Sequence, residues 1–458
     1  MNSTSKNTAT FTVGLVVVTL AIAVLYFIVT HFEMGDPKVD VGIPNKALGV
    51  EGRISGKVSD DKSGLRELWI ALSVNGKDNV IYEKKYSAPF YSKKNRTFSA
   101  VVDAPVDLKK MGLVDGPALL RIRVSDGSLW GWFSGNVTYI EKEIMLDTRY
   151  PEIDLISRNH NLVPGGTGLA IYKVSEKGAK TGVRVGDNFF PGHGGYFKDP
   201  DIMMAFFALT QLQGPGTKLY IEAADSAGNK TLAGFTHYIA NKKYKNDIIP
   251  ITDDYLDTNM PTVRIDGLEG FHGNNLEKFL KINGELRVKN EQRILGPGPF
   301  TEETLYWAGS FLRLPASATK AAFADHRTYI YNDKTVDDQY HLGYDLASVK
   351  QSDVPAANSG KVVLIDTIGI YGKTVVIDHG FGLFSSYSHL SRVNVEVSKV
   401  VAKGDVVGTT GITGLAAGDH LHFGMYVHNV FVDPLQWWDA SWIKNNITSK
   451  IRDAQPDL

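Results

Sequence analysis

One long apolar segment near the N-terminus sets the first constraint on how this chain can fold. From Phe11 to Phe32 the sequence holds no charged side chain apart from His31, which can ionise. About 20 apolar residues are enough for an α-helix to cross a bilayer. We therefore expect a transmembrane anchor at residues 11–32, preceded by a cytoplasmic tail at residues 1–10.

A cleaved signal peptide is the alternative interpretation of the same segment. Ala21-Ile22-Ala23 has the small-residue pattern of a cleavage site, but cutting there would leave an apolar new N-terminus. The apolar run is also longer than that of an ordinary signal peptide, which favours an uncleaved anchor. Lys6 precedes the segment and mainly acidic residues follow it, so the positive-inside tendency places the bulk of the chain outside the membrane.

A linker at residues 33–48 is expected after the anchor, and the sequence then becomes rich in short β-strand patterns. Alternating apolar runs at residues 68–74 and 119–124 are followed by the turn-forming pairs Asn75-Gly76 and Asp126-Gly127. Many short strands at this spacing are typical of β-sandwiches rather than of βαβ units. The chain is therefore predicted to be mainly β.

A faint internal repeat divides this β-rich region into two halves. Residues 124–127 and 224–229 each end a strand-like run with a polar turn, and residues 147–151 lie between them like a hinge. These turns resemble those of bacterial immunoglobulin-like repeats. We therefore expect two immunoglobulin-like modules, at residues 49–146 and 147–240.

Residues 241–299 differ in pattern from the modules and are expected to form a helical connector. Apolar residues recur at helical spacing from Asn275 to Ile294, although Gly284 weakens the case for one continuous helix. A Gly-Pro-Gly-Pro run then interrupts the chain at residues 296–299. This interruption predicts the boundary of a C-terminal domain.

The C-terminal region, residues 300–438, is again β-rich and is followed by a tail at residues 439–458. Seven of the twelve histidines lie in this last third of the chain, so any metal or proton chemistry is expected there. The chain contains no cysteine, which excludes disulfides and any zinc site built on thiolates. Its formal net charge of −1 gives no indication of nucleic-acid binding.

Two short motifs in this region carry side chains that can bind a metal ion. His341 and Asp345 are four residues apart around Gly343, and His420 and His422 are two apart in a strand-like run. Residues i and i+2 of a strand point to the same face, so one imidazole can bind a metal while the other serves in proton transfer. Two histidines and an aspartate leave a fourth tetrahedral position for water, which is the arrangement of a catalytic zinc site.

The order of motifs in this region resembles that of the lysostaphin/LytM-type zinc metallopeptidases, which cut peptidoglycan. The resemblance covers about residues 320–437 and implies a small antiparallel β fold. The motifs that carry it are His341-Leu342-Gly343-Tyr344-Asp345, Val354-Pro355-Ala356-Ala357, Tyr387-Ser388-His389-Leu390, Lys403-Gly404-Asp405 and Gly418-Asp419-His420-Leu421-His422-Phe423.

Transferred residue by residue, the resemblance implies that His341, Asp345 and His422 bind one Zn²⁺ ion. His389 and His420 are then the catalytic pair that orients or deprotonates the attacking water and stabilises the oxyanion. The implied activity is an endopeptidase that opens peptide cross-links, with peptidoglycan peptide stems as its partner. Such a substrate requires a location outside the cytoplasm, which agrees with a single-pass protein of the bacterial inner membrane.

Two other functions remain open from the sequence. A scaffold that activates another cell-wall hydrolase is one, although all five site positions are filled here. A D-Ala-D-Ala carboxypeptidase is the other. In those enzymes the first ligand pair has the spacing His-x6-Asp, whereas only three residues separate His341 from Asp345 here. A cell-envelope protein that binds the immunoglobulin-like modules is a further expected partner.

Overall fold

The structure, a computed structural model, describes residues 4–87 and 94–455. Its elements are mainly strands, as predicted from the sequence. The chain forms two units, residues 1–151 with 224–230 and residues 152–223 with 231–458, which are described separately below. Parts of the predicted cytoplasmic tail, residues 1–3, and of the predicted C-terminal tail, residues 456–458, lie outside the described residues.

The first unit begins with the apolar helix that the sequence predicts. This helix, α1 (Thr4–His31), contains the segment Phe11–Val29, which is long and apolar enough to cross a membrane. None of that segment is buried against the rest of the protein, so packing in a protein core does not explain its apolar character. The helix is therefore compatible with a membrane span.

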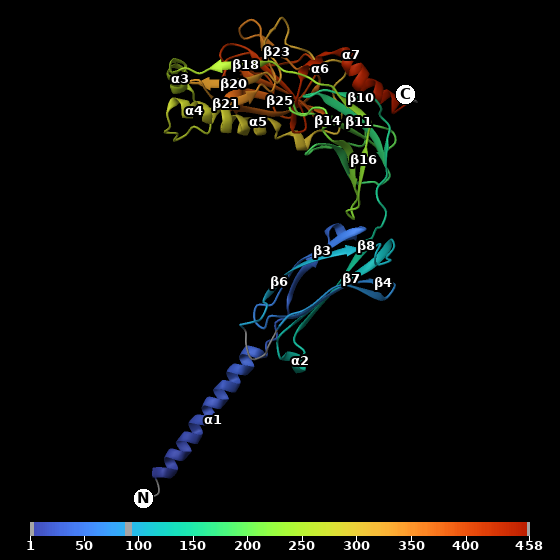
Figure 1. The fold of residues 1–458 in the computed structure, drawn as a ribbon, viewed down its shortest axis with the longest axis vertical. Helices are drawn as coiled ribbons and strands as arrows, with labels where there is room; N and C mark the ends of the chain where they lie inside the picture. Colours follow the sequence, from blue (N-terminus) through green and yellow to red (C-terminus); the bar gives the residue numbers. More distant parts are fainter. Residues whose placement is uncertain (1–3, 88–93, 456–458) are drawn as a thin grey trace. The chain divides into compact units, whose positions relative to one another are not determined.

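Two sheets make up most of the remainder of the first unit (Figure 1), and their buried side chains form one core; every pair in them is antiparallel except β2 with β8, which is parallel. The run predicted at residues 68–74 lies in β4, and the run at 119–124 lies in β7; the two strands pair with Leu68 opposite Val124. Buried side chains in β3 and β6 alternate with more exposed ones, as expected for strands covered on one face. One sheet contains β1 (Lys38–Gly42), β3 (Glu51–Ser59) and β6 (Ser99–Asp107), and the other contains β2 (Ala47–Leu48), β8 (Val137–Leu146), β7 (Gly116–Asp126), β4 (Leu65–Val74) and β5 (Lys77–Lys85), with the short helix α2 (Trp130–Phe133) before β8.

The second unit starts with three small sheets that share their core with the C-terminal domain. Phe206 in β14 packs against Trp437, with ring centroids 6.1 Å apart, and Trp437 is fully buried. Trp437 thus closes the core. The strands are β9 (Ile153–Leu155), β10 (His160–Leu162), β11 (Thr167–Val174), β12 (Lys180–Val185), β13 (Asn188–Pro191), β14 (Ile202–Ala208), β15 (Leu219–Ala224), β16 (Lys230–Gly234) and β17 (His237–Ile239).

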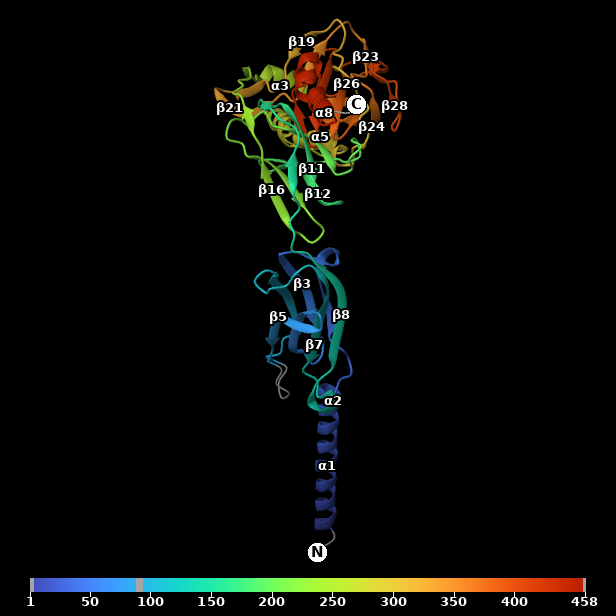
Figure 2. The same ribbon diagram turned by 90° about the vertical axis from the view of Figure 1, so that its right-hand side faces the viewer.

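An eight-stranded sheet forms the centre of the C-terminal domain (Figure 2). Its strands follow the order β19-β22-β30-β26-β25-β24-β28, with β31 paired to β30, and each of these neighbouring pairs is antiparallel. This order places β22 and β26 on either side of β30. The strands are β19 (Ala318–Ala321), β22 (Tyr344–Ala347), β24 (Gly360–Ile368), β25 (Gly372–Gly380), β26 (Leu383–Leu390), β28 (Val400–Val401), β30 (Leu421–Val427) and β31 (Val430–Val432).

Two three-stranded sheets accompany the central one. The first joins a strand from the expected connector, β18, to two strands of the C-terminal region, with β18 parallel to β20. In the second, β29 pairs antiparallel with β23 on one side and with β27 on the other. Their strands are β18 (Asn246–Pro250), β20 (His326–Tyr331) and β21 (Lys334–Tyr340) in the first, and β23 (Asp353–Pro355), β29 (Val406–Thr409) and β27 (Arg392–Val393) in the second.

The helix predicted between Asn275 and Ile294 is present, but it is interrupted at its centre. Gly284, which weakened the prediction, lies in a π-helical turn, η3 (Ile282–Leu286), between α4 (Asn275–Lys281) and α5 (Arg287–Leu295). Figure 1 shows α4 and α5 following one another along the domain. The other helices are α3 (Asp253–Asn259), α6 (Pro434–Trp438), α7 (Ala440–Ile443) and α8 (Ser449–Asp453), together with the 3-10 turn η5 (Gly369–Tyr371).

Candidate metal centre

The structure brings together the three side chains that the sequence predicts as metal ligands, His341, Asp345 and His422. His341 Nε2 lies 3.1 Å from Asp345 Oδ1 and 3.1 Å from His422 Nδ1. The distance from His422 Nδ1 to Asp345 Oδ1 is 2.9 Å. One ligand atom from each residue therefore lies within 4.8 Å of the other two, and we call this group the His–Asp–His cluster.

Strand register accounts for much of this convergence. Asp345 in β22 lies directly opposite His422 in β30, and His341 precedes β22 by three residues. Gly343 lies between them at a place where a side chain cannot fit. A Cβ atom there would be 2.7 Å from His422 Nε2 and 2.7 Å from the carbonyl oxygen of Phe423. Glycine is thus required so that the turn can approach the histidine ring.

Backbone carbonyls orient the imidazole rings. The Nδ1–H of His341 donates to the carbonyl of Ala322 over 2.9 Å, which leaves its Nε2 lone pair directed at the cluster. Since a carbonyl only accepts, this contact selects the tautomer. Two imidazole lone pairs and a carboxylate oxygen that face one another are stable only with a proton or a cation among them, so the arrangement fits a divalent metal ion.

The two predicted catalytic residues, His389 and His420, lie beside the cluster. Their ring centroids are 4.7 Å apart, and His420 Nε2 is 3.5 Å from Asp345 Oδ1. His389 donates from Nδ1 to the carbonyl of Thr413 over 2.8 Å, and His420 donates to that of Gly418 over 2.7 Å. Both rings consequently keep Nε2 available on the side of the pocket. The structure thus brings all five predicted site residues together.

His389 adopts an unusual backbone conformation at the end of β26. Its φ of 61° lies in the left-handed region, which costs a non-glycine residue free energy unless the surrounding structure imposes it. Ser388, the preceding residue, pairs with His422 across β26 and β30. The turn at His389 therefore directs the ring out of the strand and toward the cluster.

Burial and neighbouring charges shift the pKa values in opposite directions. Burial lowers the pKa of His389 to about 3 and that of His422 to about 4. Burial also acts to lower the pKa of His420, but the hydrogen bond and charge of Asp345 outweigh it and the pKa is raised. Burial would raise the pKa of Asp345, yet His341 and its neighbours hold that pKa well below its usual value.

The five residues line a pocket of about 240 Å³. Three further polar residues line this pocket and were not among the sequence-predicted site residues: Arg287, Arg327 and Tyr371. Tyr371 packs its ring 5.3 Å from that of His422 and donates from its hydroxyl to Glu291 Oε1 over 3.5 Å. Tyr371 follows a β-strand within the resemblance and could have been suspected. Arg287 lies on α5, outside the motifs, where nothing in the sequence pattern relates it to the pocket.

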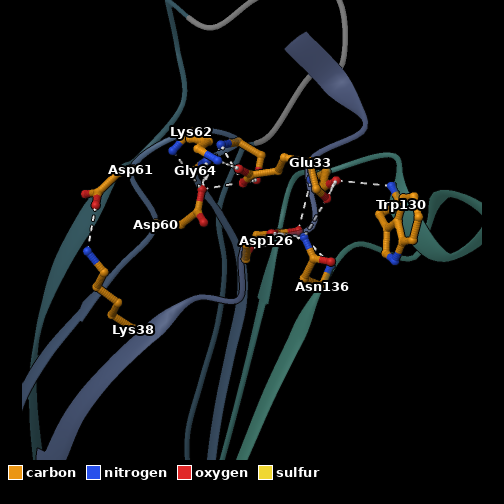
Figure 3. A network of polar contacts seen from close by, with 12 residues as sticks. Glu33, Lys38, Asp60, Asp61, Lys62, Gly64, Asp126, Trp130 and Asn136 are labelled. Atoms are coloured by element: carbon orange, nitrogen blue, oxygen red, sulfur yellow. Dashed lines mark hydrogen bonds and ion pairs between the residues drawn. The ribbon is translucent and has the colours of Figure 1, made fainter. Parts of the chain in front are cut away.

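Three buried carboxylates in the first unit, Glu33, Asp60 and Asp126, also lie within 4.8 Å of one another, and we call them the carboxylate cluster (Figure 3). Asp60 Oδ1 accepts backbone N–H bonds from Ser63 over 2.7 Å and from Gly64 over 2.6 Å. Glu33 Oε1 accepts the hydroxyl of Ser63 over 2.9 Å. These carboxylates are therefore already hydrogen-bonded to a turn of the protein.

Asp126 completes the carboxylate cluster in the same way. Its Oδ1 accepts from the backbone N–H of Ser128 over 3.0 Å and of Asn136 over 2.8 Å, and its Oδ2 accepts from the Asn136 side chain over 2.8 Å. Arg96 is buried nearby; burial lowers the pKa of its guanidinium, and the charges of Asp60 and Asp126 oppose this shift. The cluster is consequently supplied with protein donors and a cationic side chain.

Comparison with known families identifies the region that contains the His–Asp–His cluster. Residues 339–434 match the sequence profile of peptidase family M23. Over 96 residues the chain is 31% identical to peptidoglycan DD-endopeptidase ShyB of Vibrio cholerae. The aligned segment covers 21% of this chain and 22% of that protein. Over 95 residues it is 33% identical to DD-carboxypeptidase/endopeptidase Mpg of Neisseria meningitidis, with the same shares of 21% and 22%.

The matches concern only part of each relative. The chain spans about a fifth of the length of these two curated relatives. Among solved structures, one of a protein described as an M23 peptidase from Pseudomonas aeruginosa aligns with 61% of this chain and 95% of its own. The sequence identity is 20% and the TM-score is 0.38.

Proposed function

Since residues 339–434 form a peptidase family M23 domain, we propose that this protein is a zinc-dependent endopeptidase that hydrolyses peptide cross-links of bacterial peptidoglycan. The sequence relatives support the substrate class, since one is named a peptidoglycan DD-endopeptidase and another a DD-carboxypeptidase/endopeptidase. The enzyme would differ from a scaffold or activator in that its own residues perform the hydrolysis.

The convergence of His341, Asp345 and His422 is the observation that carries this proposal. Their facing nitrogen and oxygen atoms, 2.9–3.1 Å apart, would hold Zn²⁺ through two imidazoles and one carboxylate. When bound, zinc polarises a carbonyl oxygen and lowers the pKa of a bound water to about 7. The carbonyl of Ala322 keeps the His341 ring in the tautomer that such a site needs.

His389 and His420 would form the catalytic pair. Because their Nδ1 atoms are engaged with the carbonyls of Thr413 and Gly418, each ring offers Nε2 to the pocket. One imidazole can accept the proton of the attacking water, and the other can donate a hydrogen bond to the developing oxyanion. The pair would also hold the proton until it transfers to the leaving amine.

The remainder of the chain would place this activity outside the cytoplasm. We propose that residues 11–32 anchor the protein in the inner membrane, with a tail at 1–10 inside and a linker at 33–48 outside. Residues 49–146 and 147–240 would be immunoglobulin-like modules that act as spacers or bind a cell-envelope protein. A connector at 241–299, the peptidase domain at 300–438 and a tail at 439–458 complete the proposed organisation.

Digestion of purified sacculi by the detergent-solubilised full-length protein tests the function. The wild-type protein is expected to contain one zinc ion and to release peptides, and mass spectrometry distinguishes an opened cross-link from loss of a terminal D-Ala. His389→Ala should retain zinc and lose activity, whereas His422→Ala should lose both. Zinc-independent release, or equal release by the wild type and His422→Ala, would overturn the proposal. No release at all by a zinc-loaded wild type would favour the scaffold.

A further inference from the structure

Two guanidinium groups line the same pocket as the His–Asp–His cluster. Arg287 begins α5, and Arg327 lies in β20 between β18 and β21. Both residues precede the segment 339–434 that matches the peptidase family. Both are half-buried, so part of each side chain is shielded from solvent beside the pocket. The connector and the β20 strand thus contribute positive charge that the family motifs do not include.

Arg287 is positioned by neutral groups. Its Nε donates to the carbonyl of Asn283 over 3.1 Å, and its Nη2 donates to the Asn283 side chain over 2.5 Å. Asn283 is 2% exposed and is itself fixed by its amide, which donates to Asp337 over 2.6 Å. Asn283 belongs to the π-helical turn at Gly284, and such turns are frequent at functional sites. Arg287 is therefore held in place by an amide that leaves its charge unneutralised.

The nearby carboxylate on the same helix, Glu291, forms no direct ion pair with Arg287, although the charge of Arg287 acts to lower the pKa of Glu291 against the effect of burial. Glu291 lies one turn further along α5 and receives the hydroxyl of Tyr371. Among the residues that the structure describes, no carboxylate oxygen lies within 4.0 Å of the Arg287 guanidinium. A half-buried guanidinium without an ion-pair partner is costly unless a ligand supplies the negative charge.

Arg327 is only weakly paired. Its Nη2 is 3.9 Å from Asp345 Oδ2, beyond hydrogen-bond distance, while the other oxygen of Asp345 contacts His341 and His422. If Asp345 binds a metal ion, its negative charge is shared with that ion. The pocket then has an excess of positive charge beside the atoms that would hold the metal, which favours an anionic ligand.

We propose that Arg287 and Arg327 bind a carboxylate of the substrate peptide close to the scissile bond. The planar fork of a guanidinium matches a carboxylate, and a buried charge-assisted hydrogen bond is stronger than a neutral one. The inference rests on the proposed peptidase function and adds a specificity: the peptide must carry a free carboxylate at this position. The carboxylate belongs either to a side chain within the peptide or to its C-terminus, and these two sources can be separated experimentally.

The test compares matched peptides on the zinc-loaded, detergent-solubilised full-length protein. One pair of stem peptides carries either a free or an amidated side-chain carboxylate beside the scissile bond, and a second pair has either a free or an amidated C-terminus. The wild type is expected to favour the free form of one pair by about tenfold or more in kcat/KM, the effect of one charged hydrogen bond, mainly through KM. The pair that shows this preference identifies the source of the carboxylate.

Substitutions at the two arginines should remove the preference. Arg287→Gln and Arg327→Gln are expected to bring the ratio of kcat/KM for free and amidated peptides close to one. Arg293→Gln is the matched control, since Arg293 lies on the same helix but pairs with Asp366 over 2.9 Å, and the lining residues of the pocket do not include it. Zinc content and melting temperature of each variant show whether it is folded. If Arg287→Gln does not fold, Arg327→Gln tests the same preference.

The possible results separate this inference from the function on which it rests. A wild type that cleaves free and amidated peptides equally in both pairs would overturn the carboxylate preference and leave the peptidase proposal intact. Folded arginine variants that lose activity on free and amidated peptides in the same proportion would also overturn it. A wild type that binds zinc but cleaves none of the four peptides or sacculi would instead contradict the peptidase function.

Discussion

The His–Asp–His cluster and the carboxylate cluster are alike in size but differ in what surrounds their lone pairs. Each brings three side chains that can bind metal within 4.8 Å of one another. In the carboxylate cluster, Asp60 and Asp126 each accept two or more N–H bonds from the backbone. In the His–Asp–His cluster, Asp345 contacts only imidazoles and the distant Arg327 among the described residues.

The hydrogen bonds of the surrounding protein decide which of these groups of side chains can accept a cation. Protein donors that point at a carboxylate occupy the lone pairs that a metal would need. In the His–Asp–His cluster the donated hydrogen of His341 points away from the centre, to the carbonyl of Ala322. The lone pairs therefore face inward. Proximity of three ligand residues is thus insufficient to make a metal site. The direction of the protein's own hydrogen bonds decides whether the lone pairs are available to a metal ion.

Removing one ligand from each cluster should give the largest contrast. His422→Ala is expected to lose bound zinc and to reduce peptide release by more than about 100-fold, since loss of a supporting partner alone typically costs 10- to 100-fold. Asp126→Asn should leave zinc content and activity unchanged, because the carboxylate cluster has no part in either. Metal analysis and sacculus digestion measure both. Zinc lost from the Asp126→Asn protein would show that the carboxylate cluster also binds metal.

Metal removal should affect the two units unequally. Zinc at 1,000 times its dissociation constant stabilises a folded state by about 4 kcal/mol, so a chelator should lower the melting temperature of the second unit. The first unit is expected to melt at the same temperature with and without the chelator. Differential scanning calorimetry of the full-length protein resolves this. Parallel shifts of both transitions on chelation would contradict the distinction between the two clusters.

Loss of the hydrogen bonds around Asp126 should destabilise the first unit alone. Asp126→Ala removes the carboxylate that accepts from the buried backbone N–H groups of Ser128 and Asn136, and a buried N–H group that loses its acceptor costs about 1–3 kcal/mol. Urea unfolding followed with a probe in each unit should show the effect only in the first. Asp61→Ala is a suitable control, since Asp61 forms an exposed ion pair with Lys38. Equal destabilisation by both substitutions would refute a supporting role for the cluster.

The sequence allowed prediction of the metal-ligand group but not of its surroundings. His341, Asp345, His389, His420 and His422 lie in ordered motifs that resemble those of a known family, and the resemblance implied that they converge. Arg287 reaches the pocket only because α5 packs against η5 and β24, a tertiary contact that no local pattern encodes. The carboxylate cluster is similar in this respect.

Its members show why such contacts escape sequence analysis. Glu33, Asp60 and Asp126 are separated by 27 and 66 residues. In the sequence, Asp126 and Gly127 together predicted only a turn, and Asp126 lies at the end of β7 where that turn begins. Asp126 lies close to Asp60 because the two sheets pack against each other. This packing brings loops of both sheets together at one end of the unit. Short-range rules identified the turn and could not identify its partners.

Glu291 offers a third environment for a carboxylate and gives the smallest expected effect. Burial raises the pKa of Glu291 to about 6 from its ordinary 4.5, and the charge of Arg287 and the Tyr371 hydroxyl oppose this only in part. Between pH 4.5 and 6 the folded protein consequently binds more protons than the unfolded chain. The free energy of unfolding therefore decreases as the pH rises through this window, by up to about 2 kcal/mol.

Glu291→Gln should remove this decrease. Urea unfolding of the second unit is measured between pH 4.5 and 6.5 in the presence of a chelator, so that proton release on metal binding does not contribute. The difference between the wild type and Glu291→Gln should fall as the pH rises across the window. Glu285→Gln is the control, because hydrogen bonding to Lys289 lowers the pKa of Glu285 and no titration is expected in this range. The same pH dependence for Glu291→Gln and the wild type would contradict this prediction. It would mean that other groups offset the effect of burial on the pKa of Glu291. Glu291 would then resemble the carboxylate cluster, whose carboxylates accept hydrogen bonds from the protein.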